Sequence, residues 1–420
     1  MIRLNKRLAI GAGLMLGLVP MAVPAAAQQA GGKQAQGQSQ SGQPALKLSK
    51  EELAAAGPIQ TAIQAKNFDA AAAALSAAQA VFKTADGRYF ASIAQLQIGI
   101  GKNDKAMQLA GLEGMIASGK VAQSDLPKFY NNIATLATDT GDYAKAEQAV
   151  AKLAEIAPND PGPVISLAQA KIKQNRPAEA VTLLDRAITM QKASGQAVPE
   201  SWYRVALGQA ATARLMPQVT KIGSNLVASY PTPKNWQDAL GILIEQTASD
   251  RDTEIDIYRL MRATKSLTSA NDYAAYTRVL SNAGLPGEVK AVLDEGVAAN
   301  LINPTDARFA PMRSSVAGRI AADKVSLPAD EKKALAASNG VLAAGVASAH
   351  FAYGDYAKAI ELYRAALKKG SVDANVVNTR LGMALALSGQ KAEAESAFKA
   401  VSGPRADLAT FLLAWLSQRS

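Results

Sequence analysis

The stretch from Gly340 to Asp373 reads GVLAAGVASAHFAYGDYAKAIELYRAALKKGSVD, and it decides how the chain folds. Small residues before Gly354 and larger apolar residues after it recur with the period of one face of an α-helix. Gly354 can end the first helix because glycine adopts a left-handed backbone at no steric cost. The stretch therefore predicts two antiparallel helices joined by a tight turn, with an apolar face that the pair cannot bury alone.

The same pattern recurs along the chain. The turn Gly-Asp-Tyr-Ala-Lys-Ala at 354–359 appears again at 141–146. Weaker copies lie at 101–106, 175–180, 284–289 and 389–394, and a plausible first copy lies at 66–71. Periodicity and proline or glycine breaks predict helical hairpins at roughly 50–85, 87–120, 127–160, 161–194, 201–234, 235–269, 270–303, 340–373 and 375–404.

These copies resemble tetratricopeptide repeats. The matching residues are the Gly-Asp-Tyr-x-x-Ala turns, Leu207-Gly208 and Leu381-Gly382 inside first helices, and Pro158 at a repeat end. The resemblance implies an all-α fold: an α-solenoid of about nine to ten hairpins, wound as a right-handed superhelix, with a C-terminal capping helix. The pattern departs from the family at 235–269, where Ser249-Asp250-Arg251-Asp252 replaces the glycine turn, and at 304–339.

Six regions follow from this interpretation. They are a signal peptide (1–27), a disordered Gln/Gly/Ser-rich linker (28–48), repeats (49–303), an irregular helical segment (304–339), two further repeats (340–404) and a C-terminal capping helix (405–420). Order is expected to begin at Ser49, which with Glu52 forms a capping box. Within 304–339 we expect two helices, one from Phe309 to Ile320 and one after Pro328. The apolar stripe of the last segment is expected to cover the end of the stack, with docking to a partner or membrane surface as the alternative.

The first residues have the pattern of a secretory signal. Arg3, Lys6 and Arg7 precede an apolar run that ends at Val23, and Ala25-Ala26-Ala27 offers a cleavage site. An uncleaved anchor is the rival, but the run is shorter than the ~20 residues of a membrane span. The chain has no cysteine, so it cannot be a lipoprotein. The sequence predicts a periplasmic or secreted protein with no stable membrane span after cleavage.

Charge patterning sets limits on the partner. The formal net charge is +10, and removing the three basic residues of the signal segment leaves +7. Lysine and glutamate are interspersed, which favours solvated helix faces over a basic patch. Nucleic acid is not expected as a partner of an exported chain. An anionic envelope polymer, or the export-assembly machinery, remains an alternative partner because of the basic excess.

Residues suited to catalysis or metal binding are scarce. The chain has one histidine, His350, on the packed face of its helix, where a packing role is expected. Acidic groups at Asp250–Asp252 and Asp330-Glu331 are expected to stabilise helix starts. The sequence therefore predicts no enzyme, no catalytic residue, no metal site and no cofactor. An all-α glycan-active enzyme is a weaker alternative, since aromatic residues make up only 5% of the chain.

Binding residues follow from the family resemblance. In tetratricopeptide-like arrays the first helices of successive hairpins line a concave groove that holds peptides. The residues placed toward that groove are Lys128, Asn131, Thr135, Asp139, Gln169, Lys173, Gln209, Arg278 and Asn282. Simple solvation of the inner face is the alternative role for each. The sequence thus predicts a non-catalytic scaffold or adaptor that binds a protein or peptide partner of the cell envelope.

Overall fold

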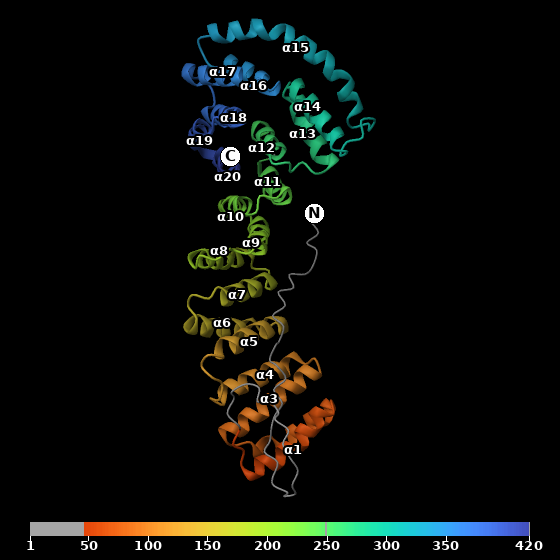
Figure 1. Ribbon diagram of the computed structural model, residues 1–420, viewed down its shortest axis with the longest axis vertical. Helices are drawn as coiled ribbons and strands as arrows, with labels where there is room; N and C mark the ends of the chain where they lie inside the picture. The colour runs from red at the N-terminus through yellow and green to blue at the C-terminus, as the bar shows by residue number, and fades with distance from the viewer. Residues whose placement is uncertain (1–45, 248–249, 420) are drawn as a thin grey trace, which may run out of the picture. The chain divides into compact units, whose positions relative to one another are not determined.

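The computed structural model describes residues 46–247 and 250–419. The predicted signal peptide and most of the predicted linker lie outside these ranges. Contacts divide the chain into two compact units, of which unit 1 ends at Val198 and unit 2 begins at Pro199. Throughout the described ranges all regular secondary structure is helical, as the all-α prediction requires (Figure 1).

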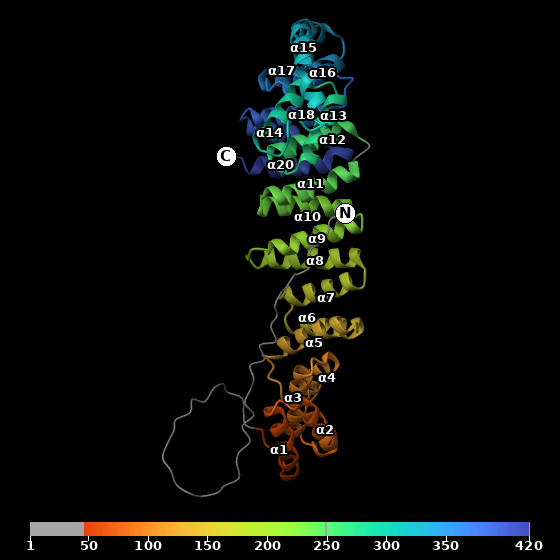
Figure 2. The ribbon, with the colours of Figure 1, turned by 90° about the vertical axis from the view of Figure 1, so that its right-hand side faces the viewer.

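Unit 1 is a stack of paired helices (Figures 1 and 2). Its helices are α1 (Lys50–Gln64), α2 (Phe68–Ala78), η1 (Gln79–Val81), α3 (Ala85–Gly101), α4 (Lys105–Ala117), α5 (Leu126–Thr140), α6 (Tyr143–Ile156), α7 (Gly162–Lys173) and α8 (Pro177–Ala193). Each pair packs within itself and against the next pair, so each apolar face that a hairpin leaves open is covered by its neighbour.

In the Gly-Asp-Tyr turns, the glycine ends the first helix and the aspartate begins the second. Gly141 ends α5 with a left-handed φ of 81°, and Gly354 has a φ of 76°. Asp142 then begins α6, because its carboxylate accepts a hydrogen bond from the backbone N–H of Lys145 at 3.1 Å. The structure therefore confirms the predicted turn at Gly141 and the helix that follows it.

The weaker copy at 101–106 uses its glycine differently. Asn103, with a φ of 54°, takes the left-handed position there. Gly101 remains helical, and a Cβ on it would lie 2.3 Å from the ring of Phe68. Glycine is needed at this position for close packing between helices and not for the turn.

The packed structure includes residues just before the predicted start at Ser49. Ser49 and Glu52 form the expected capping box. Leu46 and Leu48, however, already pack against the apolar core that Ile59 and Phe90 help to form. Residues 46–48, which the prediction assigned to the linker, therefore belong to the packed structure, because their two leucines cover apolar surface.

Unit 2 contains the remaining helices. They are α9 (Glu200–Thr212), α10 (Met216–Ser229), α11 (Pro233–Thr247), α12 (Arg251–Ala263), α13 (Ala270–Asn282), α14 (Pro286–Ala298), α15 (Ala310–Ala336), α16 (Val341–Ala352), α17 (Tyr356–Lys369), α18 (Ala374–Leu387), α19 (Lys391–Lys399), η2 (Gly403–Arg405) and α20 (Ala406–Ser417).

The segment 304–339 differs from its prediction. Instead of two helices separated near Pro328, it forms the single helix α15, which continues through that proline. Proline removes one backbone hydrogen bond and leaves the carbonyl of Lys324 without its partner. Both residues are exposed on α15, so water can satisfy that carbonyl. Asp330 and Glu331 consequently lie inside a helix and not at a helix start, which corrects their predicted capping role.

The end of the chain closes unit 2. Helix α20 packs on α19, as a capping helix should, and also on α10 near the beginning of the unit (Figure 1). The rings of Phe411 and Trp236 lie 6.4 Å apart, and the side chain of Gln418 donates to the carbonyl of Val227 at 2.9 Å. Contacts between α12 and α18 complete the closure. The array in unit 2 therefore returns to its own start.

Candidate functional site

Six of the predicted groove residues lie on two adjacent helices of unit 1. We call this set the α5–α7 polar face; it consists of Lys128, Asn131, Thr135 and Asp139 on α5, and Gln169 and Lys173 on α7. Their spacing places the residues of each helix on one side of it, and α5 and α7 pack together. Most of these side chains are exposed. The face is therefore available to a partner.

Several residues of the α5–α7 polar face form hydrogen bonds with one another or with a residue of the preceding helix α4. The carboxylate of Asp139 accepts from Lys173 at 2.5 Å and from Lys105, at the start of α4, at 3.0 Å. Partial burial opposes ionisation of Asp139, but these two hydrogen bonds outweigh it and lower the pKa of its carboxyl. Ser166 donates to the side chain of Asn131 at 3.2 Å. The face is thus a connected set of polar groups, with Asp139 ionised.

The other three predicted residues belong to unit 2. Arg278 lies 3.9 Å from Glu254 as a loose ion pair, and its side chain is 65% exposed. Asn282 is exposed on the same helix, and Gln209 is partly buried on α9. The structure does not bring these residues together with those on α5 and α7 in one unit. Their role in binding remains a prediction.

A buried ionic cluster in unit 2 was not predicted. It centres on Asp256, which is fully buried and pairs with Arg259, at 3.0 Å, and with Arg380 and Arg405. Arg259 in turn makes a two-pronged pair with Glu288, whose closest N–O distance is 2.6 Å. The cluster thereby joins α12 to α14, α18 and η2. It fixes the closure of unit 2 from the inside.

The chemistry of this cluster is structural. Burial disfavours the charged form of Asp256, but the guanidinium groups of Arg380, Arg405 and Arg259 prevail and lower its pKa. The same competition, settled by Arg259, lowers the pKa of Glu288. Carboxylates held ionised and fully hydrogen-bonded are weak bases, so they are poorly suited to proton transfer near neutral pH. A sequence signal did exist: Asp256 and Arg259 interrupt an apolar run from Ile255 to Met261.

His350 has the packing role expected of it. Its side chain is buried, with Nε2 2.9 Å from Glu331 on α15 and Nδ1 3.1 Å from Asp355 at the start of α17. Both ring nitrogens are occupied by carboxylates. The histidine therefore links α15 to the hairpin that follows it.

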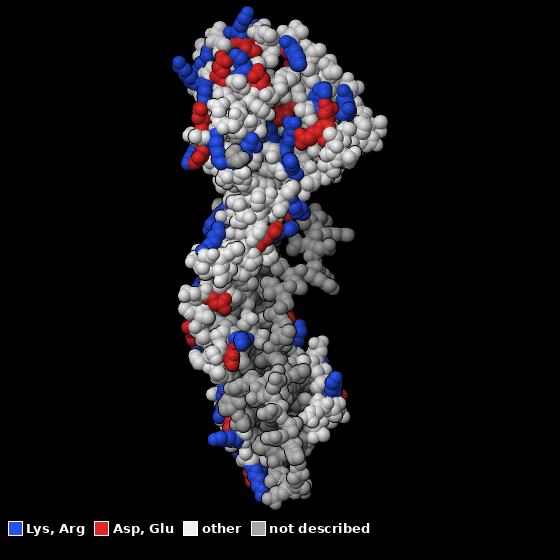
Figure 3. Space-filling view, in the orientation of Figure 1, with Lys and Arg blue, Asp and Glu red and all other residues white. Residues whose placement is uncertain are grey.

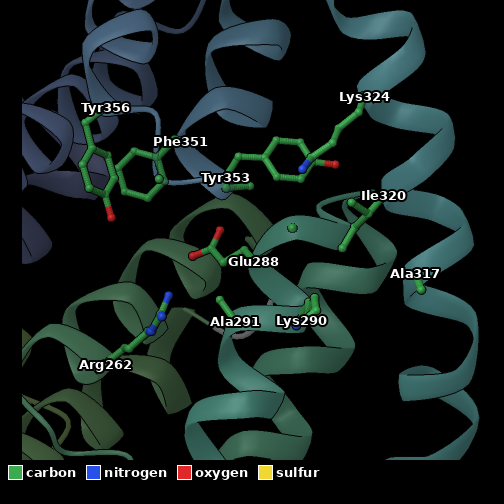
Figure 4. A pocket seen from close by; sticks show the side chains of 13 residues that line it. Arg262, Glu288, Lys290, Ala291, Ala317, Ile320, Lys324, Phe351, Tyr353 and Tyr356 are labelled. Atoms are coloured by element: carbon green, nitrogen blue, oxygen red, sulfur yellow. The ribbon is translucent and has the colours of Figure 1, made fainter.

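A pocket lies beneath α15. It has a volume of about 440 Å³ and is bounded by α14, by α15 and by the turn between α16 and α17 (Figure 4). Basic and aromatic side chains line it, among them Arg262, Lys324 and Tyr353. Over the described part of the chain, no group of three acidic or histidine side chains is placed to hold a metal ion.

Elsewhere the surface shows mixed charge. On the face of unit 2 drawn in Figure 3, basic and acidic side chains alternate, and neither sign forms a broad patch. Across the described ranges, no helix combines the length and apolar character needed to cross a bilayer.

Comparison with known families agrees with the helix pairs. Two tetratricopeptide repeat models match, one over residues 137–194 and one over residues 347–414. The chain is a tetratricopeptide repeat protein. The first match begins in α5 and runs to the end of α8. It includes three residues of the α5–α7 polar face, Asp139, Gln169 and Lys173.

Solved structures with similar folds have low sequence identity to this repeat protein. A tetratricopeptide repeat protein from Parabacteroides merdae is 11% identical, with 79% of this chain and 99% of that one covered and a TM-score of 0.28. The pentatricopeptide repeat protein PPR10 from maize is 15% identical, covering 87% and 56%, with a TM-score of 0.33. Naa15/Naa10 bound to HypK-THB is 12% identical, covering 86% and 58%, also at 0.33. No curated protein matches the sequence.

Tetratricopeptide repeats are protein-binding modules, and the fold is typically that of a scaffold without catalytic activity. A partner of such repeats would bind at an exposed helix face or in a pocket.

Proposed function

We propose that the chain is an exported, non-catalytic scaffold that binds a protein or peptide partner of the cell envelope through the α5–α7 polar face. The observation that carries the proposal is the exposed polar face on two packed helices of a tetratricopeptide repeat array. Its mixed donors and acceptors suit a peptide backbone and polar side chains. Its charged residues already have partners, Lys173 with Asp139 and Lys128 with Asp125, which favours a peptide over a highly charged polymer.

Site-specific photocrosslinking tests the binding face. Gln169 is the position for a photoreactive amino acid, because its side chain is exposed and makes no hydrogen bond with the described residues. Thr182, exposed on α8, is the matched control on a second helix. We expect crosslinking in the producing cells to yield a discrete partner from Gln169 and not from Thr182. The same products from both positions would contradict the proposed face.

The salt dependence of binding distinguishes a peptide partner from an anionic polymer. Binding driven by counterion release falls steeply as salt rises, whereas peptide binding on a mixed polar face changes less. Crosslinking from Gln169 should therefore persist when the salt concentration is raised severalfold. Loss of the product at high salt would favour the polymer.

Export is tested directly on the mature chain. We propose that the signal segment is cleaved after Ala27 and that the protein is periplasmic or secreted. N-terminal sequencing of the protein from fractionated cells should begin at Gln28. A mature chain that still begins at Met1, recovered from the cytoplasm, would overturn this part of the proposal.

A further inference from the structure

The pocket beneath α15 has the size of a ligand site. Its volume of about 440 Å³ falls in the range of pockets that bind small molecules or a few side chains, roughly 300–1,000 Å³. Four parts of the chain build it: α12, α14, α15 and the segment from Phe351 to Tyr356 around the turn between α16 and α17 (Figure 4). All of them belong to unit 2.

Positive charge predominates in the lining. Arg262, Lys290 and Lys324 reach the pocket from three different helices, and Glu288 is the one carboxylate among its lining residues. Glu288 is already neutralised, because Arg259 donates three hydrogen bonds to it and the hydroxyl of Tyr276 donates a fourth at 2.6 Å. The pocket therefore retains an excess of cations over available anions.

Arg262 has donors to spare. Its Nε donates to Glu295 at 2.7 Å, while its two terminal nitrogens make no hydrogen bond among the described residues. Figure 4 shows this guanidinium directed from α12 into the space beside Glu288 and Tyr356. Two parallel N–H groups of an arginine match the two oxygens of a carboxylate, and such pairs are among the stronger hydrogen-bonded contacts.

Lys324 adds a second cation opposite Arg262. Its ammonium group lies 5.9 Å from the centre of the Tyr353 ring and forms no ion pair with the described residues. Lys290, by contrast, already pairs with Asp294 at 2.5 Å. Arg262 and Lys324 are thus the two cations with capacity left for a ligand.

The rest of the wall is apolar or aromatic. Phe351 and Tyr356 meet edge to face with ring centres 5.3 Å apart, and Ile320 and Ala291 line the space beside them. A ligand that fits this lining carries a carboxylate next to a large apolar group.

We infer that the pocket beneath α15 binds an acidic peptide segment in which Asp or Glu adjoins an aromatic or branched apolar side chain. The inference takes from the proposed function only that the ligand is a peptide, and it places that peptide in unit 2, away from the α5–α7 polar face. Arg262 and Lys324, on opposite sides of the pocket, are each placed to bind a carboxylate, while Phe351 and Tyr356 pack against the apolar side chain.

Fluorescence anisotropy with defined peptides and the full chain tests this. The probe is a fluorescein-labelled Gly-Phe-Glu-Leu-Glu-Gly peptide amidated at its C-terminus, and Gly-Phe-Gln-Leu-Gln-Gly amide is its neutral counterpart. We expect the acidic peptide to bind at least about tenfold more tightly, since only it offers carboxylates to the arginine fork. The neutral peptide with a free C-terminus shows whether a terminal carboxylate serves as well. Equal binding of the acidic and neutral amides would overturn the inference.

Matched variants on α15 locate the binding. Lys324→Glu should weaken the acidic peptide by about tenfold or more, whereas Lys332→Glu, the same change at an exposed position outside the lining, should leave it within about twofold. Ala317→Trp should fill the pocket and abolish binding, with Ala322→Trp as its exposed control. Affinity unchanged by both Lys324→Glu and Ala317→Trp would refute the site. If the unit 1 crosslinks succeed while this test fails, the proposed function stands and only the pocket assignment falls.

Discussion

Unit 1 and unit 2 are built from the same kind of hairpin but place their charges differently. In unit 1, Asp139 pairs with lysines at the surface, and its side chain is 33% exposed. In unit 2, Asp256 pairs with three arginines and is completely buried. Exposed pairs hold neighbouring helices in register at little cost, whereas a buried cluster must satisfy every charge it contains. The difference shows that the repeat itself does not dictate whether an array stays open.

The two units also differ in how far apart in the sequence their contacting helices lie. Helices in unit 1 pack on helices one or two places away in the chain. In unit 2, the pair of Arg405 and Asp256 bridges 149 residues, and α20 packs on α10. Long-range pairs of this kind turn a stack that could extend further into a closed body with its own interior.

The largest expected effect comes from removing the central charge of unit 2. Asp256→Asn leaves the buried Arg259 and Arg405 and the partly buried Arg380 without their shared anion, which should lower the free energy of unfolding of unit 2 by about 3–5 kcal/mol. All three tryptophans, at positions 202, 236 and 415, lie in unit 2, so tryptophan fluorescence during urea unfolding reports on that unit.

Asp139→Asn makes the same chemical change at the surface of unit 1. Its cost should stay within about 1 kcal/mol, because exposed ion pairs contribute little. Far-UV circular dichroism, which follows the helices of both units, measures it. Equal losses in the two variants would mean that burial of the cluster does not govern the stability of unit 2.

Overpacking the turn alanines should affect both units alike. Ala146 and Ala359 are buried to 1% and 0% exposure in the second helices of their hairpins. Replacing either with leucine forces the paired helices apart and should cost about 1–3 kcal/mol. The exposed alanines two residues earlier provide controls, since Ala144→Leu and Ala357→Leu should melt close to the unmodified protein. A sharp, unchanged thermal transition in Ala146→Leu or Ala359→Leu would count against close packing at these turns.

The helix pairs could be predicted because each is encoded locally. Gly141 and Gly354 end helices, Asp142 begins one, and small residues at Ala146 and Ala359 let the helices approach. The capping box at Ser49 is equally local, and it was confirmed. Such features need only a few neighbouring residues to be recognised.

The parts that were missed depend on distant partners. The residues near Asp256 in the sequence do not indicate that Arg380 and Arg405 are its partners. The closure of unit 2 therefore could not be predicted from a repeat pattern. Pro328 indicated a break between helices, and only an exposed position on a long helix allows it to be tolerated. Of the nine predicted binding residues, the structure gathers the six on α5 and α7, because hairpin spacing fixes their side of each helix.

Acid should weaken the buried ionic cluster of unit 2. Asp256 and Glu288 have pKa values lowered from 3.8 and 4.5 in the folded state. Folding therefore gains stability from their ionised forms at neutral pH, and that stability is lost as pH falls below about 4.5 toward the folded-state pKa values. Tryptophan fluorescence should show the urea midpoint of unit 2 falling through this range. Asp256→Asn should flatten the dependence, and an equally steep fall in that variant would show that other carboxyls are responsible.

The smallest effect is expected at the surface pair that best represents unit 1. Lys173→Gln removes one of the two cations around Asp139 while Lys105 remains 3.0 Å away. The loss should be less than about 1 kcal/mol at low salt, and it should shrink as salt screens the exposed charges. Urea unfolding followed by circular dichroism at low and high salt measures the difference. Asp256→Asn offers the contrast. Because salt screens a buried cluster poorly, the loss of unfolding free energy in this variant should be the same at low and high salt. A salt response that was the same for both variants would remove the distinction between surface pairing in unit 1 and buried pairing in unit 2.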